Sequence, residues 1–138
     1  MSFSANVIDY KGKDVIELTA GKYKAVVAPF LGSNVMRMQD TENGIEVFRY
    51  NESLSPEELQ ASAEVYGFPT LYLPNRLAGG VLKVSDATYN FPLNDPLGNH
   101  IHGFLHKREH SIVSAVADDN KAVAKTEYVY DENDEFFQ

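Results

Sequence analysis

Hydrophobic and polar residues alternate along many short stretches of this chain, a pattern typical of strands that bury one face. Turn-forming residues, such as those at 11–14 and 41–44, separate these stretches, and successive strands start about ten residues apart. This arrangement favours an antiparallel sandwich or barrel over a sheet whose strands alternate with helices. The predicted strands lie at residues 7–10, 15–18, 23–29, 35–38, 45–50, 70–73, 81–84, 88–91, 111–117 and 122–130.

One helix interrupts the predicted strands. Ser55 is a good N-cap residue, Pro56 suits the first helical position, and Glu58 stands at the spacing of a capping box. The helix is predicted to begin near residue 56, to run to about residue 64, and to end before Gly67. Because it is short and acidic, we expect it to lie at the surface.

Length and composition fit one domain of the all-β class. The 138 residues are 43% hydrophobic, which is enough for a packed core, and eight tyrosines and eight phenylalanines favour strands. We therefore predict a single domain over residues 1–138, built as an antiparallel β-sandwich with one short helix.

Charge and cysteine content exclude several classes of function. The net charge of −8 opposes binding to nucleic acid and to anionic membrane surfaces, whereas it is compatible with a neutral or cationic ligand. The absence of cysteine excludes disulfides and thiolate metal sites. We see no signal peptide and no apolar run of the ~20 residues that would span a bilayer. A cytoplasmic protein is the expectation.

All four histidines lie between residues 100 and 110. On a strand, His100 and His102 would point the same way, and His106 or Glu109 could complete a metal site. Gly103 follows immediately, however, and no acidic ligand stands at the spacing expected of such a site. The signal for a metal is therefore weak, and we predict neither a metal nor a cofactor.

A polar ligand pocket is the second interpretation of this region. Asn75 and Arg76 follow Pro74, which favours an extended backbone before it, and they offer an amide and five guanidinium donors. Asn99 and His102 supply a similar mixture of donors and acceptors, as a hydroxyl-rich neutral ligand such as a sugar requires. Aromatic faces for such a ligand stand nearby at Tyr66, Phe68, Tyr72 and Phe104.

Plainer interpretations exist for the same residues. Arg76 could pair with an acidic neighbour and His102 could cap a turn. We predict that His110 is solvated and that His106 lies at the rim of any pocket. The acidic run at 131–135 is predicted to be a solvated turn, and the apolar pair at 136–137 gives the chain the look of a fold cut short.

Several motifs together resemble the aldose 1-epimerase (galactose mutarotase-like) family. Each motif is weak alone, but their order and spacing are fairly specific, and the resemblance extends over residues 15–138. The motifs are residues 27–33 (Val-Ala-Pro-Phe-Leu-Gly-Ser), 67–71 (Gly-Phe-Pro-Thr-Leu), 74–79 (Pro-Asn-Arg-Leu-Ala-Gly), 89–94 (Tyr-Asn-Phe-Pro-Leu-Asn) and 99–103 (Asn-His-Ile-His-Gly).

The resemblance implies a large β-sandwich, the galactose mutarotase-like supersandwich, and an enzyme that interconverts the α and β anomers of aldohexoses. Arg76 and His102 match the family residues that bind the sugar and polarise its oxygens, so His102 is the one candidate catalytic residue. Asn75 would orient the sugar or Arg76. The implied partner is a small-molecule sugar.

The resemblance covers only the N-terminal half of the family. The family's general base, a glutamate, and its general acid, a second histidine, have no counterpart here, so we expect little epimerase activity from a truncated chain of this length. Strand edges left open by truncation would favour a homodimer or another association. Two other functions remain open: a non-catalytic carbohydrate-binding or regulatory module, and a metal-dependent jelly roll centred on His100 and His102.

Overall fold

The computed structural model describes residues 1–130 and 134, and its contacts divide the chain into two compact units. The first unit comprises Met1–Thr70 and His106–Tyr128, and the second comprises Leu71–Leu105 with the described residues from Val129 onward. Apart from Asp134, the acidic run and the apolar pair predicted near the C-terminus lie outside the described residues. The single-domain expectation stays a prediction.

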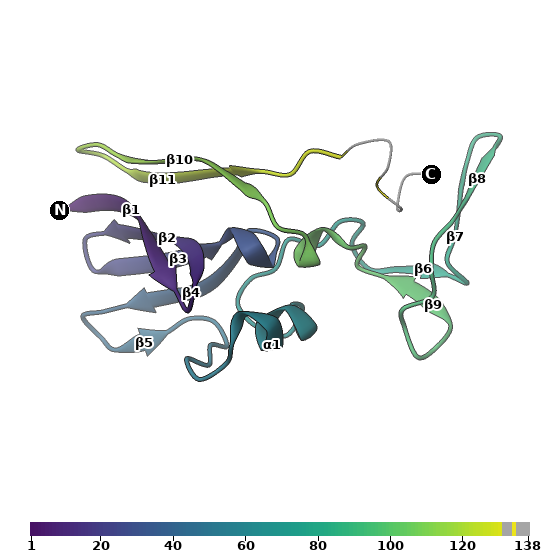
Figure 1. Ribbon diagram of the computed structural model, residues 1–138, viewed down its shortest axis with the longest axis horizontal. Coiled ribbons are helices and arrows are strands. Elements are labelled where there is room, and N and C mark those ends of the chain that lie inside the picture. Colours follow the sequence, from purple (N-terminus) through teal and green to yellow (C-terminus); the bar gives the residue numbers. More distant parts are fainter. Residues whose placement is uncertain (131–133, 135–138) are drawn as a thin grey trace. The chain divides into compact units, whose positions relative to one another are not determined.

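The first unit contains a five-stranded antiparallel sheet (Figure 1), with its strands in the order β1-β2-β3-β4-β5. Four of the strands confirm the positions that alternation predicts, although β1 and β2 are longer than expected. The strands are β1 (Phe3–Tyr10), β2 (Lys13–Ala20), β3 (Tyr23–Ala28), β4 (Asn34–Asp40) and β5 (Ile45–Glu46).

The turn between β1 and β2 is tighter than the sequence indicated. Tyr10 pairs with Lys13, so only two residues form the loop. Lys11 has φ 51° and Gly12 has φ 86°. Two successive positive φ values belong to the turn that matches the twist of a two-residue hairpin, which explains why both strands extend almost to it.

The strand predicted over residues 45–50 ends at Glu46, so that prediction is wrong beyond β5. After Glu46 the chain leaves the edge of the sheet, and its side chains contact aromatic residues of another segment. Phe48 stacks on Phe68 with ring centroids 5.7 Å apart, and the guanidinium of Arg49 lies 4.9 Å from the ring centroid of Tyr66. These contacts with a distant segment outweigh local strand propensity.

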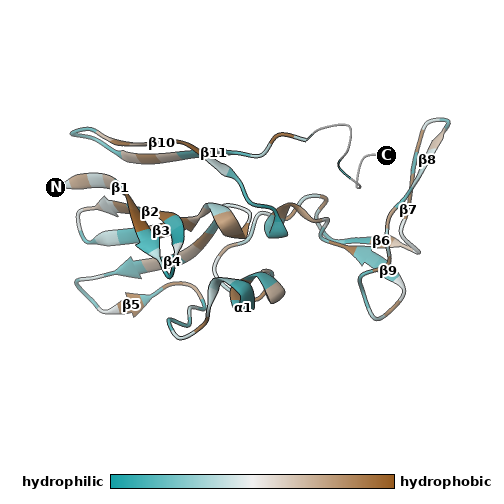
Figure 2. Ribbon diagram, in the orientation of Figure 1, coloured by the Kyte–Doolittle hydropathy of each residue, from teal (hydrophilic) through white to brown (hydrophobic). Residues whose placement is uncertain are grey.

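Helix α1 (Pro56–Ala61) begins where the capping signal predicts and ends three residues before the expected end at residue 64. Ser55 Oγ accepts a 3.2 Å hydrogen bond from the Glu58 N–H, and Glu58 Oε2 accepts a 2.7 Å bond from the Ser55 N–H. Both halves of the capping box are therefore present. Figure 2 shows that α1 is largely hydrophilic, which fits a helix that buries only Pro56 and Leu59.

The core of the first unit lies between the sheet, the 3₁₀ helix η1 (Pro29–Leu31) and α1. Burying these apolar side chains supplies the main driving force for the fold of this unit. The core cluster is Val15, Ala28, Phe30, Leu31, Met36, Leu59 and Ala63.

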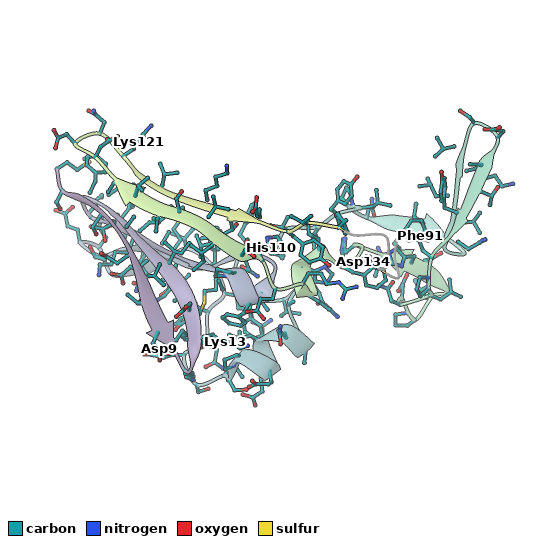
Figure 3. The ribbon with its side chains drawn as sticks, turned by 45° about the horizontal axis from the view of Figure 1, so that its top comes forward. Asp9, Lys13, Phe91, His110, Lys121 and Asp134 are labelled. Carbon is teal, nitrogen blue, oxygen red and sulfur yellow. The ribbon has the colours of Figure 1, made fainter. Side chains whose placement is uncertain are left out.

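Strands β10 (Ser111–Ala117) and β11 (Ala122–Glu127) form a hairpin, as the sequence predicts, but β11 ends three residues before the expected end at residue 130. Asp118 Oδ1 accepts hydrogen bonds from the main-chain N–H groups of Asn120 and Lys121, which closes the turn. Lys121 stands at the tip of this hairpin (Figure 3).

The second unit contains two small antiparallel ladders. Strand β6 (Arg76–Ala78) pairs with β9 (Asn99–Ile101), and β7 (Val81–Val84) pairs with β8 (Ala87–Asn90). The strand predicted at 70–73 is absent; within it only Tyr72 makes an isolated bridge, to Gly103. A second 3₁₀ helix, η2 (Leu105–Lys107), begins at the last residue of the Leu71–Leu105 segment, and its other two residues are assigned to the first unit.

The described elements are thus almost entirely antiparallel strands with one short α-helix, which confirms the predicted fold class. The part of the chain that the structure describes contains no helix with the length and apolar character needed to cross a membrane.

Candidate functional site

The β6–β9 ladder brings the residues singled out from the sequence together. Arg76 pairs in register with Ile101, so Asn75 and His102 meet at the same end of the ladder. The Asn75 N–H donates to His102 Nδ1 over 3.1 Å, and the His102 N–H donates to the Asn75 carbonyl over 3.0 Å. Asn75, Arg76 and His102 therefore form one cluster within the second unit.

This meeting requires an unusual backbone at both residues. Asn75 has φ 66° and His102 has φ 63°, in the left-handed region that side chains other than glycine rarely occupy. Asparagine and histidine are among the residues that tolerate this conformation best. The strain is held in place by the reciprocal hydrogen bonds and by the ladder, and such strain is often found at binding sites.

The bond to Nδ1 fixes the chemical character of His102. Because a main-chain N–H can only donate, Nδ1 must accept, and the neutral ring then carries its proton on Nε2. His102 is half-buried, so Nε2 is the ring atom left to donate a hydrogen bond to a ligand oxygen.

Arg76 pairs with an acidic residue that the sequence analysis did not single out. Its Nε lies 2.9 Å from Asp95 Oδ2. The side chain of Asp95 is only 5% exposed, whereas that of Arg76 is 49% exposed. Hydrogen bonds from Asn99 and Arg76 hold the pKa of Asp95 below its ordinary value. The plainer interpretation of Arg76, an ion pair with an acidic neighbour, is therefore realised.

The side-chain amides of Asn94 and Asn99 make hydrogen bonds that hold the loop before β9 and the start of that strand. Asn94 Oδ1 accepts a 2.6 Å bond from the Ile101 N–H, and Asn94 Nδ2 donates to the Ile101 carbonyl over 3.0 Å. Asn99 Nδ2 donates to Asp95 Oδ2 over 3.0 Å. Asn99, which was predicted to face a ligand, thus donates a hydrogen bond to Asp95 instead. Asn94 holds the main chain of Ile101, the residue before His102.

His100 is buried between two phenylalanines (Phe91 is labelled in Figure 3). Its ring centroid lies 5.0 Å from that of Phe91 and 4.9 Å from that of Phe104, and Nδ1 lies 2.8 Å from the Pro92 carbonyl. His102 lies beyond the end of β9 in a left-handed conformation, so the argument that both rings share one strand face is wrong. Residues 1–130 and 134 hold no group of three or more potential ligands that could bind a metal ion.

The other two histidines belong to the first unit, and both predictions for them are wrong. His106 is buried, with Nε2 3.8 Å from Glu64 Oε2, rather than lying at a rim. His110 is half-buried rather than solvated; its Nδ1 lies 2.8 Å from Ser33 Oγ and its ring packs against Tyr128 at 5.6 Å. Both rings join segments distant in sequence, which no local pattern could reveal.

The four aromatic residues proposed as sugar faces divide between the units. Tyr72 and Phe104 belong to the second unit with Arg76, and Tyr72 is 52% exposed. Tyr66 and Phe68 belong to the first unit, where they contact Arg49 and Phe48.

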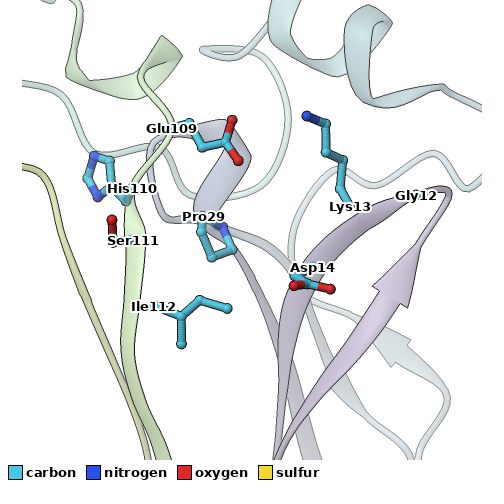
Figure 4. A pocket seen from close by; sticks show the side chains of 8 residues that line it. All are labelled: Gly12, Lys13, Asp14, Pro29, Glu109, His110, Ser111 and Ile112. Carbon is cyan, nitrogen blue, oxygen red and sulfur yellow. The ribbon is translucent and has the colours of Figure 1, made fainter.

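A cavity of about 640 Å³ lies in the first unit (Figure 4). Its lining comes from the β1–β2 turn, η1 and the start of β10, and includes none of the three clustered site residues. Charges of both signs line it, because Lys13 contributes to the wall together with Asp14 and Glu109. The lining residues are Gly12, Lys13, Asp14, Pro29, Glu109, His110, Ser111 and Ile112.

The chain matches one family model and is similar to two solved structures. A sequence model of the aldose 1-epimerase family matches residues 14–138. A galactose mutarotase-like protein from Clostridium acetobutylicum is similar in structure, with a TM-score of 0.88 and 30% identity over 97% of this chain and 40% of that one. Galactose 1-epimerase from Lactobacillus acidophilus has a TM-score of 0.66 and 21% identity over 88% of this chain and 37% of that one.

The two solved structures support a galactose mutarotase-like fold for this chain, as predicted. The chain spans about two fifths of the length of each solved protein (40% and 37%).

Proposed function

This chain belongs to the aldose 1-epimerase family, and we propose that Asn75, Arg76 and His102 bind an aldohexose or a related sugar. In a full-length protein the same site would take part in interconverting the α and β anomers of that sugar.

The observation that carries the proposal is the joining of Asn75 to His102 beside Arg76. The reciprocal main-chain and ring bonds leave His102 Nε2 as a donor, and the terminal amino groups of Arg76 are further donors on the adjacent strand. A sugar presents hydroxyl and ring oxygens that accept such bonds, so donors held at one end of the β6–β9 ladder match its chemistry.

Anomer interconversion defines what these residues would do. A proton is delivered to the ring oxygen as the bond from that oxygen to the anomeric carbon breaks, and a proton leaves the anomeric hydroxyl to form the aldehyde. Arg76 would supply fixed positive charge near oxygens that become more negative, and His102 would donate a hydrogen bond to one of them. Closing the ring on the other face of the aldehyde gives the second anomer.

We assign sugar binding and the polarisation of its oxygens to residues of this chain. The general acid and general base of the family, which transfer the protons, have no counterpart here. General acid and base steps each contribute about 10²–10⁴-fold to a rate. Polarimetry of α-galactose or α-glucose with the 138-residue chain should therefore give a rate close to the uncatalysed one. Fast mutarotation would show that residues of this chain also transfer the protons.

Sugar binding is tested by nuclear magnetic resonance titration of the ¹⁵N-labelled chain with galactose and glucose. We expect saturable shifts centred on residues 75, 76 and 102, which Arg76→Ala weakens by at least about tenfold because a charged donor is lost. Arg37→Ala is the matched control, since Arg37 makes the same kind of bond in the first unit, Nε to Glu46 Oε2 at 2.9 Å. Equal binding by both variants would contradict the proposal.

Mutarotase activity, rather than sugar binding, separates part of an enzyme from a non-catalytic carbohydrate-binding module. Both bind sugar through Arg76, but only the former gains mutarotase activity when the chain is extended to the length of its relatives. A full-length protein that binds galactose without turnover would favour the module.

A further inference from the structure

Asp95 lies in the loop between β8 and β9 and contacts Arg76 directly. We propose that Asp95 is a positioning residue, which holds the guanidinium of Arg76 by its Nε edge and thereby presents both terminal amino groups to the sugar. This inference rests on the proposed sugar site, and it assigns a role to a residue that contacts the ligand only through Arg76.

The loop fixes the carboxylate independently of Arg76. Asp95 Oδ2 accepts from Asn99 Nδ2 over 3.0 Å, and Oδ1 lies 3.4 Å from the Leu97 N–H. The main chain adds a bond from the Asp95 N–H to the Asn99 carbonyl and one from the Gly98 N–H to the Asp95 carbonyl. Because the acid is tied to its own loop, it sets the position of the longer and more exposed arginine.

The contact occupies only one edge of the guanidinium. Nε donates to Asp95 over 2.9 Å, while the two terminal amino groups have no hydrogen-bond partner among residues 1–130 and 134. Half of the Arg76 side chain is exposed. A guanidinium held at Nε keeps its planar fork in one orientation, which lowers the entropy lost when a ligand binds.

The pair also sets the charge of the site. A carboxylate only 5% exposed and 2.9 Å from Nε offsets the positive charge of Arg76. Neutral hydroxyl groups can then bind through hydrogen bonds, whereas an anion gains little from a cation already paired. Removing the carboxylate should weaken sugar binding and strengthen anion binding, a reversal that loss of structure alone would not produce.

Asp95→Asn in the full 138-residue chain tests the role. Asp86→Asn is the matched control, because Asp86 is exposed in the β7–β8 turn and its substitution removes the same charge. Three quantities are measured by nuclear magnetic resonance: the Arg76 Nε–H signal, the affinity for galactose and the affinity for inorganic phosphate. In Asp95→Asn we expect the Arg76 signal to move, galactose affinity to fall at least about tenfold, and phosphate affinity to rise by a similar factor.

Asp86→Asn should leave all three quantities at their wild-type values. If Asp95→Asn behaves like this control, the positioning role is wrong. If galactose does not bind the wild-type chain, yet Asp95→Asn moves the Arg76 signal and gains phosphate binding, the sugar function fails while the role of Asp95 stands.

Two further measurements keep the role testable if Asp95→Asn does not fold. In the wild-type chain the Arg76 Nε–H should exchange slowly with water, and rapid exchange would overturn the proposal. Asn99→Ala removes a bond to the carboxylate without changing charge. It should weaken galactose binding without raising phosphate affinity, and unchanged galactose binding would count against the role.

Discussion

The main chain of Gly103 approaches that of Tyr72 so closely that no side chain fits between them. The two residues form an isolated parallel bridge, and a Cβ built on Gly103 would collide with the Tyr72 carbonyl. Gly103 also has φ 62°, a conformation that favours glycine. Because Gly103 directly follows His102, this contact anchors the chain at the proposed sugar site.

Gly103→Ala should therefore destabilise the second unit and displace His102. Gly79→Ala is the control: Gly79 has nearly the same φ, 60°, but a Cβ there meets no atom within 4 Å. The control should lose only the ~1–2 kcal/mol typical of an L-residue in this conformation. Urea unfolding followed by resonances of residues 75–103 measures both, and an equal loss in the two variants would refute the steric argument.

Ser55→Ala should lower the free energy of unfolding by about 1 kcal/mol, because the first turn of α1 loses its capping hydrogen bond. Ser62→Ala is the comparison at the other end of the helix, where the bond to the Leu59 carbonyl comes from the main chain and survives the change. Denaturant unfolding of both variants tests the difference. A Ser62 variant as unstable as the Ser55 variant would contradict the capping role.

Stability in acid should depend on Asp40. Hydrogen bonds from Lys22, whose Nζ lies 2.9 Å from Oδ2, and from Asn43 lower the pKa of Asp40 from 3.8 to about 2. Because the folded-state value is the lower one, the carboxylate stabilises the fold fully above pH 3.8, and this contribution is lost as pH falls through about 2.

Asp40→Asn should flatten the fall in free energy of unfolding across that window, as measured by denaturant titrations at a series of pH values. Asp86→Asn should keep the wild-type slope. An unchanged slope in the Asp40 variant would show that other carboxyl groups determine the acid response.

The open strand edges lead us to propose that the isolated chain self-associates. In the described residues β7 and β8 pair only with each other, and Val84 at the end of β7 is 52% exposed. Unpaired strand edges with apolar side chains favour pairing with another chain. Size-exclusion chromatography with light scattering should give a concentration-dependent dimer that Val84→Lys weakens.

Val129→Lys makes the same change at a residue that is 75% exposed and outside any strand. It should leave the dimer intact. If the wild-type chain stays monomeric at all concentrations, the proposed self-association is wrong.

Some elements were predictable because their causes are local. The capping box joins Ser55 to Glu58, and Asp118 closes the β10–β11 turn through residues two and three positions ahead. The apolar alternation of the first four strands likewise needs only the period of a strand. A signal carried by residues only a few positions apart can be recognised in the sequence without knowledge of the fold.

Other elements escaped prediction because distant partners decide them. Strands β6 and β9 have three residues each, too few to show a period, and exist only because they pair across more than twenty residues. The predicted strand over 45–50 instead ends at β5, since Phe48 turns to stack on Phe68. His110 lies against Ser33, a contact between segments 77 positions apart.

For the proposed site, the amino-acid order alone identified which groups gather: the amide and guanidinium at 75 and 76, and the imidazole at 102. The tertiary structure decided how they are arranged. It assigned the ring proton of His102 to Nε2 through the Asn75 N–H, and it placed Asp95 against Arg76. The chemical groups of a side chain are set by the residue itself. Hydrogen-bond direction and ion pairing depend instead on strand register and loop closure, which form only when the whole chain folds.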